Sequence, residues 1–178
     1  MRIVSGKYKG RLVRPPKKIH ARPTTDFAKE NLFNILETRI DFEEKEVLDL
    51  FAGTGNISYE FVSRGCKFVR AIEKDYKHVK FIKETAEAMG MPELKVTRGE
   101  VFRFLSKCKS QYDIIFADPP YQMNNPEELP KIISGNRLLK PHGIFILEHS
   151  KHIDLSALKG FYENRNYGSV NFSFFKFS

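Results

Sequence analysis

The chain has 178 residues, of which 41% are hydrophobic and 29% charged, so it is long and apolar enough for one globular domain with a full core. No apolar run approaches the roughly 18 residues of a membrane span, and the N-terminus lacks an apolar signal segment. We therefore expect a cytoplasmic protein with no membrane partner. The two cysteines, Cys66 and Cys108, form no paired metal motif and are predicted to be buried and reduced.

The net charge of +8 is concentrated in the N-terminal segment. Residues 1–25 contain eight basic residues and no acidic one, which leaves 22 of the 30 lysines and arginines to balance the 22 acidic residues. Two short β-like pieces, with Gly6 and Gly10 between them, favour a β-hairpin over a solvated tail. A hairpin with a basic face is typical of a nucleic-acid clamp. The candidate side chains for this contact are Lys7, Lys9, Arg11, Arg14 and Arg22.

After this hairpin arm, taken as residues 1–22, residues 23–178 are predicted to form a single globular unit. Residues 25–40 predict an amphipathic helix that Thr24 or Thr25 can cap. Strands are predicted at 46–51, 67–73, 94–97, 112–117 and, after a turn at 140–143, at 143–149, with helices at 56–64, 75–90, 101–107 and 126–135. The closing residues 161–178 predict two aromatic-rich strands around Gly168, with their phenylalanines packed on both faces of the sheet.

This alternation of strands and helices predicts an α/β fold. The sheet is expected to be Rossmann-like, mostly parallel and doubly wound, with an antiparallel C-terminal strand. Ligands of such sheets bind beyond the carboxyl ends of the strands. Residues 49–56 and 118–121 each follow a predicted strand directly, so we expect them to lie on the same rim.

The loop after the first of these strands, DLFAGTGN, indicates the class of cofactor. Gly53 and Gly55 allow a tight turn and a close approach of the backbone to a ligand, but Ser58 stands where a nicotinamide fingerprint needs a third glycine. Asp49 suits a ligand with a positive amine, and Glu73, at the end of the second strand, suits a pair of ribose hydroxyls. A cofactor with a ribose, an adenine, an amine and no phosphate is S-adenosylmethionine.

A glutamate after the third strand can reach the adenine amino group, although a glutamate in that place is ordinarily a helix cap. With it, the predicted cofactor-binding residues are Asp49, Phe51, Gly53, Gly55, Glu73, Lys74, Glu100 and Val101.

The stretch YDIIFADPPYQ, residues 112–122, predicts the catalytic corner. Two acceptors aimed at the N–H groups of a nucleobase amine would localise its lone pair, and Asp118 and the carbonyl of Pro119 can supply them. Pro119 and Pro120 restrict the backbone, and Tyr121 can stack on the base. The alternative is a surface turn with a packed tyrosine. We predict no metal site, because His149 and His152 lack a third ligand and are interpreted as exposed loop histidines.

Several motifs together resemble the RsmD family of bacterial 16S ribosomal RNA guanine-N2 methyltransferases. They are RIVSGKYKGRLV (2–13), RPTTD (22–26), ENLFNIL (30–36), VLDLFAGTG (47–55), SRG (63–65), DPPY (118–121) and NYGSVNFSFF (166–175). The resemblance implies a Rossmann-like methyltransferase with an RNA-contacting hairpin. It also implies a target guanine in small-subunit rRNA, recognised within the assembled small ribosomal subunit, and we expect a monomer. The chain departs from the usual family pattern at Phe27, at Asn56-Ile57-Ser58 and at Glu100.

Two other functions remain open at this point. A DNA adenine-N6 or cytosine-N4 methyltransferase would present the same amine chemistry to Asp118 and Tyr121, although such enzymes normally carry a larger recognition region. A non-catalytic RNA-binding assembly factor would fit the basic arm, but the intact glycine loop and the complete Asp-Pro-Pro-Tyr sequence argue against it.

Overall fold

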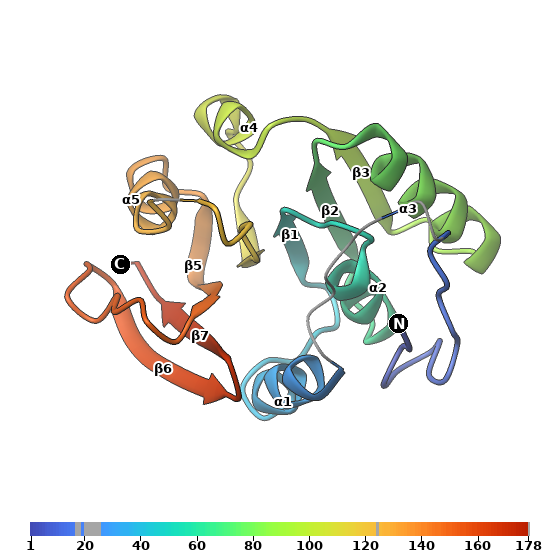
Figure 1. The fold of residues 1–178 in the computed structure, drawn as a ribbon, viewed down its shortest axis with the longest axis horizontal. Coiled ribbons are helices and arrows are strands. Elements are labelled where there is room, and N and C mark those ends of the chain that lie inside the picture. Colours follow the sequence, from blue (N-terminus) through green and yellow to red (C-terminus); the bar gives the residue numbers. More distant parts are fainter. Residues whose placement is uncertain (17–18, 20–25, 124, 178) are drawn as a thin grey trace.

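A seven-stranded sheet with the order β3-β2-β1-β4-β5-β7-β6 runs through the molecule (Figure 1). The computed structural model describes residues 1–16, 19, 26–123 and 125–177. The strands are β1 Glu46–Leu50, β2 Phe68–Glu73, β3 Leu94–Arg98, β4 Tyr112–Ala117, β5 Leu139–Ser150, β6 Phe161–Tyr167 and β7 Val170–Phe175. Neighbouring strands from β3 to β5 are parallel, whereas β7 is antiparallel to both β5 and β6. The predicted fold class is confirmed.

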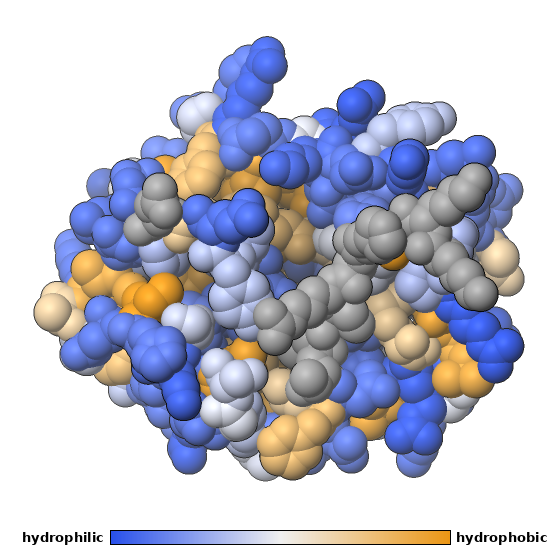
Figure 2. Space-filling view, in the orientation of Figure 1, coloured by the Kyte–Doolittle hydropathy of each residue, from blue (hydrophilic) through white to orange (hydrophobic). Residues whose placement is uncertain are grey.

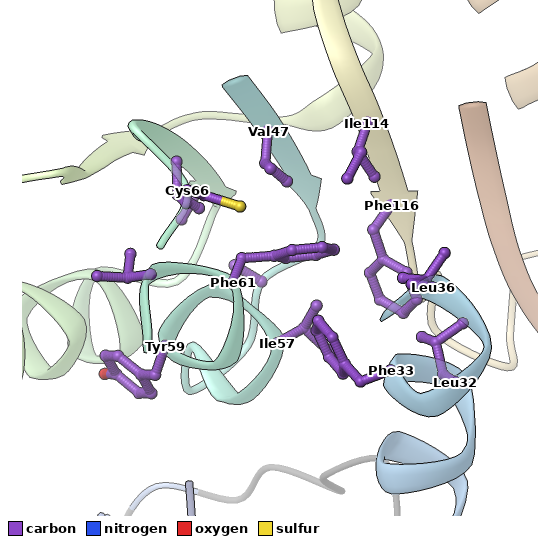
Figure 3. Packing of buried hydrophobic residues seen from close by; sticks show 14 of the residues in the cluster. Leu32, Phe33, Leu36, Val47, Ile57, Tyr59, Phe61, Cys66, Ile114 and Phe116 are labelled. Carbon is purple, nitrogen blue, oxygen red and sulfur yellow. The ribbon is translucent and has the colours of Figure 1, made fainter. Parts of the chain in front are cut away.

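Helices cover both faces of this sheet. They are α1 Asp26–Glu37, α2 Asn56–Ser63, α3 Tyr76–Met89, α4 Val101–Lys107 and α5 Glu128–Gly135. Buried residues of α1, α2 and α3 pack in one hydrophobic cluster, and those of α4 and α5 pack in a second cluster on the other face. Figure 3 shows Phe61 of α2 and Phe33 of α1 facing β1 and β4, with their ring centroids 4.8 Å apart. The sheet is therefore doubly wound.

Local signals in the sequence set the ends of α3. The carboxylate of Asp75 accepts hydrogen bonds from the backbone N–H groups of Lys77 and His78, as an N-cap does. Gly90 ends the helix with φ of 67°, a left-handed conformation that favours glycine. Most predicted element boundaries agree with the structure to within one or two residues, while Thr24 and Thr25, the expected caps of α1, lie outside the described residues.

The strand β5 is longer than predicted. We expected a turn at residues 140–143 followed by a strand, but the structure begins β5 at Leu139. Tyr112 pairs with Leu139 and Ile114 with Ile144, so the residues between them form a bulge within the strand. A Cβ at Gly143 would lie 2.9 Å from the carbonyl oxygen of Lys140, which explains the glycine there. The turn residues therefore interrupt a strand instead of preceding one.

The aromatic C-terminal hairpin packs as predicted. Phe172 and Phe174 of β7 belong to the core cluster under α1, and Phe175 belongs to the cluster on the opposite face. Phe177 packs against that second cluster as well. These phenylalanines are core residues, which leaves them unavailable for stacking on nucleobases.

The N-terminal arm is docked on the helical layer, alongside α2 and the C-terminal end of α3 (Figure 1). Ile3, Tyr8 and Val13 are buried in the same cluster as α1 and α2. Its ladder is short, consisting of an isolated antiparallel bridge between Arg2 and Leu12 with flanking backbone hydrogen bonds. The arm is thus an irregular hairpin held by its apolar side chains.

A buried ionic network fastens the arm to α1 and α2. The carboxylate of Glu60, fully buried on α2, accepts hydrogen bonds of 3.0 Å from the backbone N–H groups of Val4 and Ser5. The ammonium group of Lys29 lies 3.6 Å from Glu60 and donates to the carbonyl of Arg2 and to Asn56. Burial lowers the pKa of Lys29, against the attraction of Glu60 and Asp26. The two buried charges of this network therefore lie next to partners of opposite sign.

On the face shown in Figure 2, hydrophobic surface appears in separate areas among hydrophilic residues. Within the described ranges, none of the helices has the length and apolar character needed to cross a membrane.

Candidate active site

The two chemical stretches named from the sequence meet at one rim of the sheet. Because β1 and β4 are parallel neighbours at its centre, with Leu50 opposite Ala117, the residues that follow each strand emerge side by side. They wall a cavity of about 620 Å³, which is within the usual range for small-molecule sites. The lining includes Asp49, Phe51, Gly53, Glu73, Lys74, Glu100 and Val101, together with Asp118, Pro119, Pro120 and Tyr121.

The glycine loop wraps around one end of this cavity in an unusual backbone conformation. Phe51, Gly53 and Gly55 all have positive φ, at 60°, 56° and 83°. The value for Phe51 is uncommon for a non-glycine residue and marks a strained position at the site. Gly55 does not line the cavity; a Cβ there would lie 2.9 Å from the ring of Tyr59, so this glycine lets the loop enter α2.

Glu73 fastens the loop to the end of β2. Its carboxylate accepts a 2.9 Å hydrogen bond from the N–H of Gly53 and a 2.8 Å bond from the N–H of Asp75. Each carboxylate oxygen has a second lone pair, so these bonds leave acceptor capacity for the hydroxyls of a ribose. The imidazole of His78 lies 3.8 Å from Glu73 and also lines the cavity.

Asp49 is a buried acid at the floor of the cavity. Its side chain accepts a 2.5 Å hydrogen bond from the hydroxyl of Ser58. The pKa of Asp49 is raised to about 7, mainly by burial and also by the negative charges of Asp118 and Glu73, while the Ser58 bond opposes this rise. A cavity that disfavours its own negative charge in this way is suited to a cationic ligand, such as one with an ammonium and a sulfonium group. The residues present therefore fit S-adenosylmethionine.

Glu100 has two roles in the structure. Its carboxylate accepts hydrogen bonds from the N–H groups of Phe102 and Arg103 and so caps α4, the ordinary role expected of a glutamate in this place. It also lines the cavity, as Lys74 and Val101 do.

Several cavity residues were missed by the sequence analysis. Thr54, Asn56, Asp75 and His78 belong to the lining. His78 lies in the first turn of α3, five residues after Glu73, so its position at a helix start could have pointed to it.

The corner after β4 separates the large cavity from a smaller one. Asp118, Pro119, Pro120 and Tyr121 line both. A 2.8 Å hydrogen bond from the N–H of Met123 to the carbonyl of Pro120 closes the turn. The acceptor in this bond is Pro120, not Pro119, whose carbonyl is the predicted acceptor for the amine. The ring of Tyr121 is 58% exposed, as a stacking platform for an incoming base must be. The corner can thus present a carboxylate, a carbonyl and an aromatic face to one ligand.

The smaller cavity, which we call the corner cavity, contains residues to which the sequence analysis assigned no part in the site. Its far wall includes Glu148, His149, Ser150 and Ile153. The interpretation of His149 as an exposed loop histidine is wrong: it is buried in β5, where its ring hydrogen-bonds with Ser173 and with the carbonyl of Ser150. Burial lowers the pKa of His149, so it is neutral near pH 7. Among the described residues, no three potential ligands gather as a metal site.

The candidate nucleic-acid contacts on the arm are solvent-exposed. Lys7, Lys9, Arg11 and Arg14 all extend from the docked hairpin, and Arg22 lies outside the described residues. Lys7 and Arg11 lie 5.2 and 5.4 Å from the centre of the Tyr8 ring. The buried face of the arm is apolar, so its charge is presented outward.

Comparisons with known proteins agree with this geometry. The family model described as Conserved hypothetical protein 95 matches residues 1–176. "Ribosomal RNA small subunit methyltransferase D" of Haemophilus influenzae is 31% identical over 155 residues, which are 85% of this chain and 79% of that protein. The same-named protein of Escherichia coli K12 is 28% identical over 148 residues, covering 83% of this chain and 74% of that protein.

Solved structures extend the similarity to the fold. A hypothetical protein of Thermus thermophilus, TTHA0928, has a TM-score of 0.87 at 28% identity, covering 99% of both chains. The Thermus thermophilus 16S rRNA N2 G1207 methyltransferase RsmC, in complex with AdoMet and guanosine, has a TM-score of 0.70 at 21% identity, covering 87% of this chain and 44% of that chain. The latter shows a shared fold.

Proposed function

This chain belongs to the RsmD family, described as Conserved hypothetical protein 95, and from that premise we propose that it methylates the N2 amine of a guanine in small-subunit ribosomal RNA. The methyl donor is S-adenosylmethionine, and the large cavity is its site. The observation that carries the proposal is the position of the corner, because Asp118, Pro119, Pro120 and Tyr121 form a wall shared by the donor cavity and the corner cavity. An amine held at that wall is next to a donor in the large cavity.

The residues of the donor site bind and orient the cofactor. Asp49 holds the positively charged amino-acid end, Glu73 accepts from the ribose hydroxyls, and the backbone of the loop at Gly53 allows close approach. Glu100 and Val101 border the adenine. When bound, S-adenosylmethionine supplies a methyl group on a sulfonium sulfur, which retains the bonding electron pair when the carbon–sulfur bond breaks.

The corner activates the amine by position. Asp118 and the carbonyl of Pro119 accept hydrogen bonds from its two N–H groups, which localises the nitrogen lone pair for attack on the methyl carbon. Tyr121 stacks on the base, a contact worth about 1–3 kcal/mol in comparable sites. The nitrogen becomes acidic after it gains its new carbon bond and then releases one proton to water, so no separate strong base is required. Preorganised acceptors and proximity account for most of the acceleration.

The arm supplies affinity for RNA that does not depend on sequence. Lys7, Lys9, Arg11 and Arg14 contact phosphates, with Arg22 expected to join them. The assembled small ribosomal subunit is the proposed substrate particle.

One set of reactions tests the proposal. The protein and S-adenosylmethionine would be incubated separately with unmodified small-subunit particles, with stripped rRNA and with duplex DNA, and the digested nucleosides would be analysed by mass spectrometry. N2-methylguanosine from the particles is the expected product. N6-methyladenine or N4-methylcytosine from DNA alone would support the proposed amine methylation but contradict the proposed RNA substrate. No methylated product from any of the three substrates would contradict the proposal that the protein is a methyltransferase.

A further inference from the structure

The corner cavity provides a second set of polar groups next to the amine site. Asp118, Pro119, Pro120 and Tyr121 form its near wall, and Glu148, Ser150 and Ile153 contribute to its far wall. Its volume of about 40 Å³ has room for roughly three water molecules, which suits the edge of a base rather than a whole ring.

Strand pairing puts Glu148 next to Asp118. Ala117 of β4 is directly opposite Leu147 of β5, so the next residue on each parallel strand is again a neighbour across the ladder. The preceding residues, Phe116 and Ile146, both face the cluster under α1 and α2, and the two-residue period of a strand turns Asp118 and Glu148 the same way. Two carboxylates therefore emerge side by side from the centre of the sheet.

Glu148 is held inside the wall of the cavity. It is 5% exposed, whereas the two carboxylates at the start of α5 are more accessible: Glu127, just before the helix, is half-buried and Glu128, its first residue, is exposed. The ring of the neighbouring His149 hydrogen-bonds with Ser173 and with the Ser150 carbonyl, and Glu148 supplies the carboxylate of the far wall. An ionised carboxylate accepts hydrogen bonds and donates none.

That chemistry distinguishes between the amine-bearing bases. Guanine has an N–H donor at N1 directly beside its N2 amine, whereas adenine and cytosine have a ring-nitrogen acceptor beside theirs. A carboxylate next to the amine site accepts from the N1–H of guanine and faces a lone pair in the other two bases. We propose that Glu148 is a specificity-determining residue that selects guanine by accepting its N1–H while Asp118 and Pro119 hold the N2 amine. This inference rests on the proposed function and deepens it.

A base analogue separates this role from a structural one. 2-Aminopurine has the same exocyclic amine as guanine, but its N1 is an acceptor. Small-subunit particles would be reconstituted with RNA that carries guanine or 2-aminopurine at the position located by oligonucleotide mapping of the methylated product. For each base, kcat/KM would be measured with the wild-type protein and with Glu148→Gln, whose amide can donate to N1 of 2-aminopurine.

The expected result is a change of preference. Glu148→Gln should lower kcat/KM for guanine by roughly 10- to 100-fold and reduce the preference for guanine over 2-aminopurine by at least about tenfold. Glu148→Asp keeps the acceptors and should keep the preference at a reduced rate. Glu127→Gln removes a carboxylate from the same rim outside both cavities and should leave the preference at the wild-type value.

Three results would overturn the inference. They are an unchanged preference in Glu148→Gln, an equal loss for both bases, and a wild-type enzyme that accepts 2-aminopurine as readily as guanine. The affinity for S-adenosylmethionine, measured by calorimetry, and the melting temperature of each variant identify any variant that is misfolded or binds the donor poorly. The difference in base preference between the Gln and Asp variants then shows whether the carboxylate selects the base. If wild-type protein forms no N2-methylguanosine from particles, the proposed function fails and this inference fails with it.

Discussion

The hydroxyl of Ser58, in α2, donates a hydrogen bond to the carboxylate of Asp49, at the end of β1, across the glycine loop. The serine stands where a nicotinamide-binding fingerprint has its third glycine, and it is one of the departures of this chain from the usual RsmD pattern. It partly offsets the burial that raises the pKa of Asp49 to about 7. This pair is expected to make the proposed donor site sensitive to pH in the neutral range.

Donor affinity should therefore fall as the pH is lowered through 7. A cationic donor pairs with the ionised form of Asp49. Below the pKa of Asp49 this carboxylate must lose a proton before it can pair, which costs free energy, so donor affinity should drop by up to about tenfold per pH unit. Calorimetric titration with S-adenosylmethionine between pH 5.5 and 7.5 measures this slope. Asp49→Asn should bind more weakly and flatten the slope, which separates the effect of Asp49 from that of any other group. Ser58→Ala should move the pH midpoint of donor binding upward. If the pH dependence persists in Asp49→Asn, a group other than Asp49 causes it.

The same aspartate should make the fold less stable at high pH. Its pKa in the folded state lies above the ordinary value of an unfolded chain, so the folded state binds more protons between about pH 4 and 7, and stability is lost as the pH rises through that window. The loss is up to about 4 kcal/mol at pH 8. Asp49→Asn should consequently raise the free energy of unfolding at pH 8 and have little effect at pH 4. Denaturant titrations at both pH values check this, and equal effects would show that the pKa of Asp49 is the same in the folded and unfolded states.

Asp118→Ala should abolish turnover while leaving the donor bound. The methyl side chain has no oxygen atom, so it removes the acceptor that the corner needs for the amine N–H. Single-turnover rates should fall by at least about a hundredfold. Because the charge of Asp118 raises the pKa of Asp49, its removal should slightly strengthen donor binding at neutral pH. A variant with normal turnover would remove Asp118 from the mechanism.

Docking of the arm should depend on Gly6 and not on Gly10. Both have φ near 80°, but a Cβ at Gly6 would lie 1.8 Å from the carbonyl oxygen of Ser63, whereas nothing lies within 4 Å of one at Gly10. Gly6→Ala should displace the arm, increase tryptic cleavage at Lys7 and Lys9, and weaken RNA binding with donor affinity retained. Gly10→Ala carries the same backbone strain without the clash and serves as the control. Equal effects of the two substitutions would mean that strain alone explains the loss.

Replacing Lys7, Lys9 and Arg11 with glutamine should weaken RNA binding and should also make the affinity less dependent on salt concentration. Each lost phosphate contact should lower the slope of log affinity against log salt by about 0.7–0.9. The same three-charge reduction at Lys107, Lys109 and Lys131, on the opposite side of the sheet from the arm, is the matched control. An unchanged slope in the arm variant, measured by filter binding, would show that RNA contacts another surface.

The sequence predicted the fold and the rim because both follow from local patterns. Alternating apolar strands and amphipathic helices imply a parallel sheet, and residues after two of its strands must then emerge together. Asp49 and Asp118 were found in this way. The same logic identified the C-terminal phenylalanines as core residues.

Other features depend on contacts between distant parts of the chain. Glu148 and His149 look like ordinary polar residues at the end of a strand, and their burial depends on β7 and on the corner after β4. The bulge in β5 was predicted as a turn, because lysine, proline, histidine and glycine favour turns whether or not a strand continues through them. The hydrogen bonds from Val4 and Ser5 to Glu60 join residues more than 50 positions apart, and no local sequence pattern predicts such bonds.

That anchoring has an evolutionary consequence. The arm is held by backbone N–H groups, buried apolar side chains and a glycine, so its exposed cations contribute little to its docking. Substitutions among those cations can accumulate with little effect on folding, whereas Glu60, Lys29 and Gly6 are expected to tolerate almost no change. Relatives can thus diverge in the charge of the arm while preserving its attachment, and an exchange of its outward side chains between relatives should yield folded proteins.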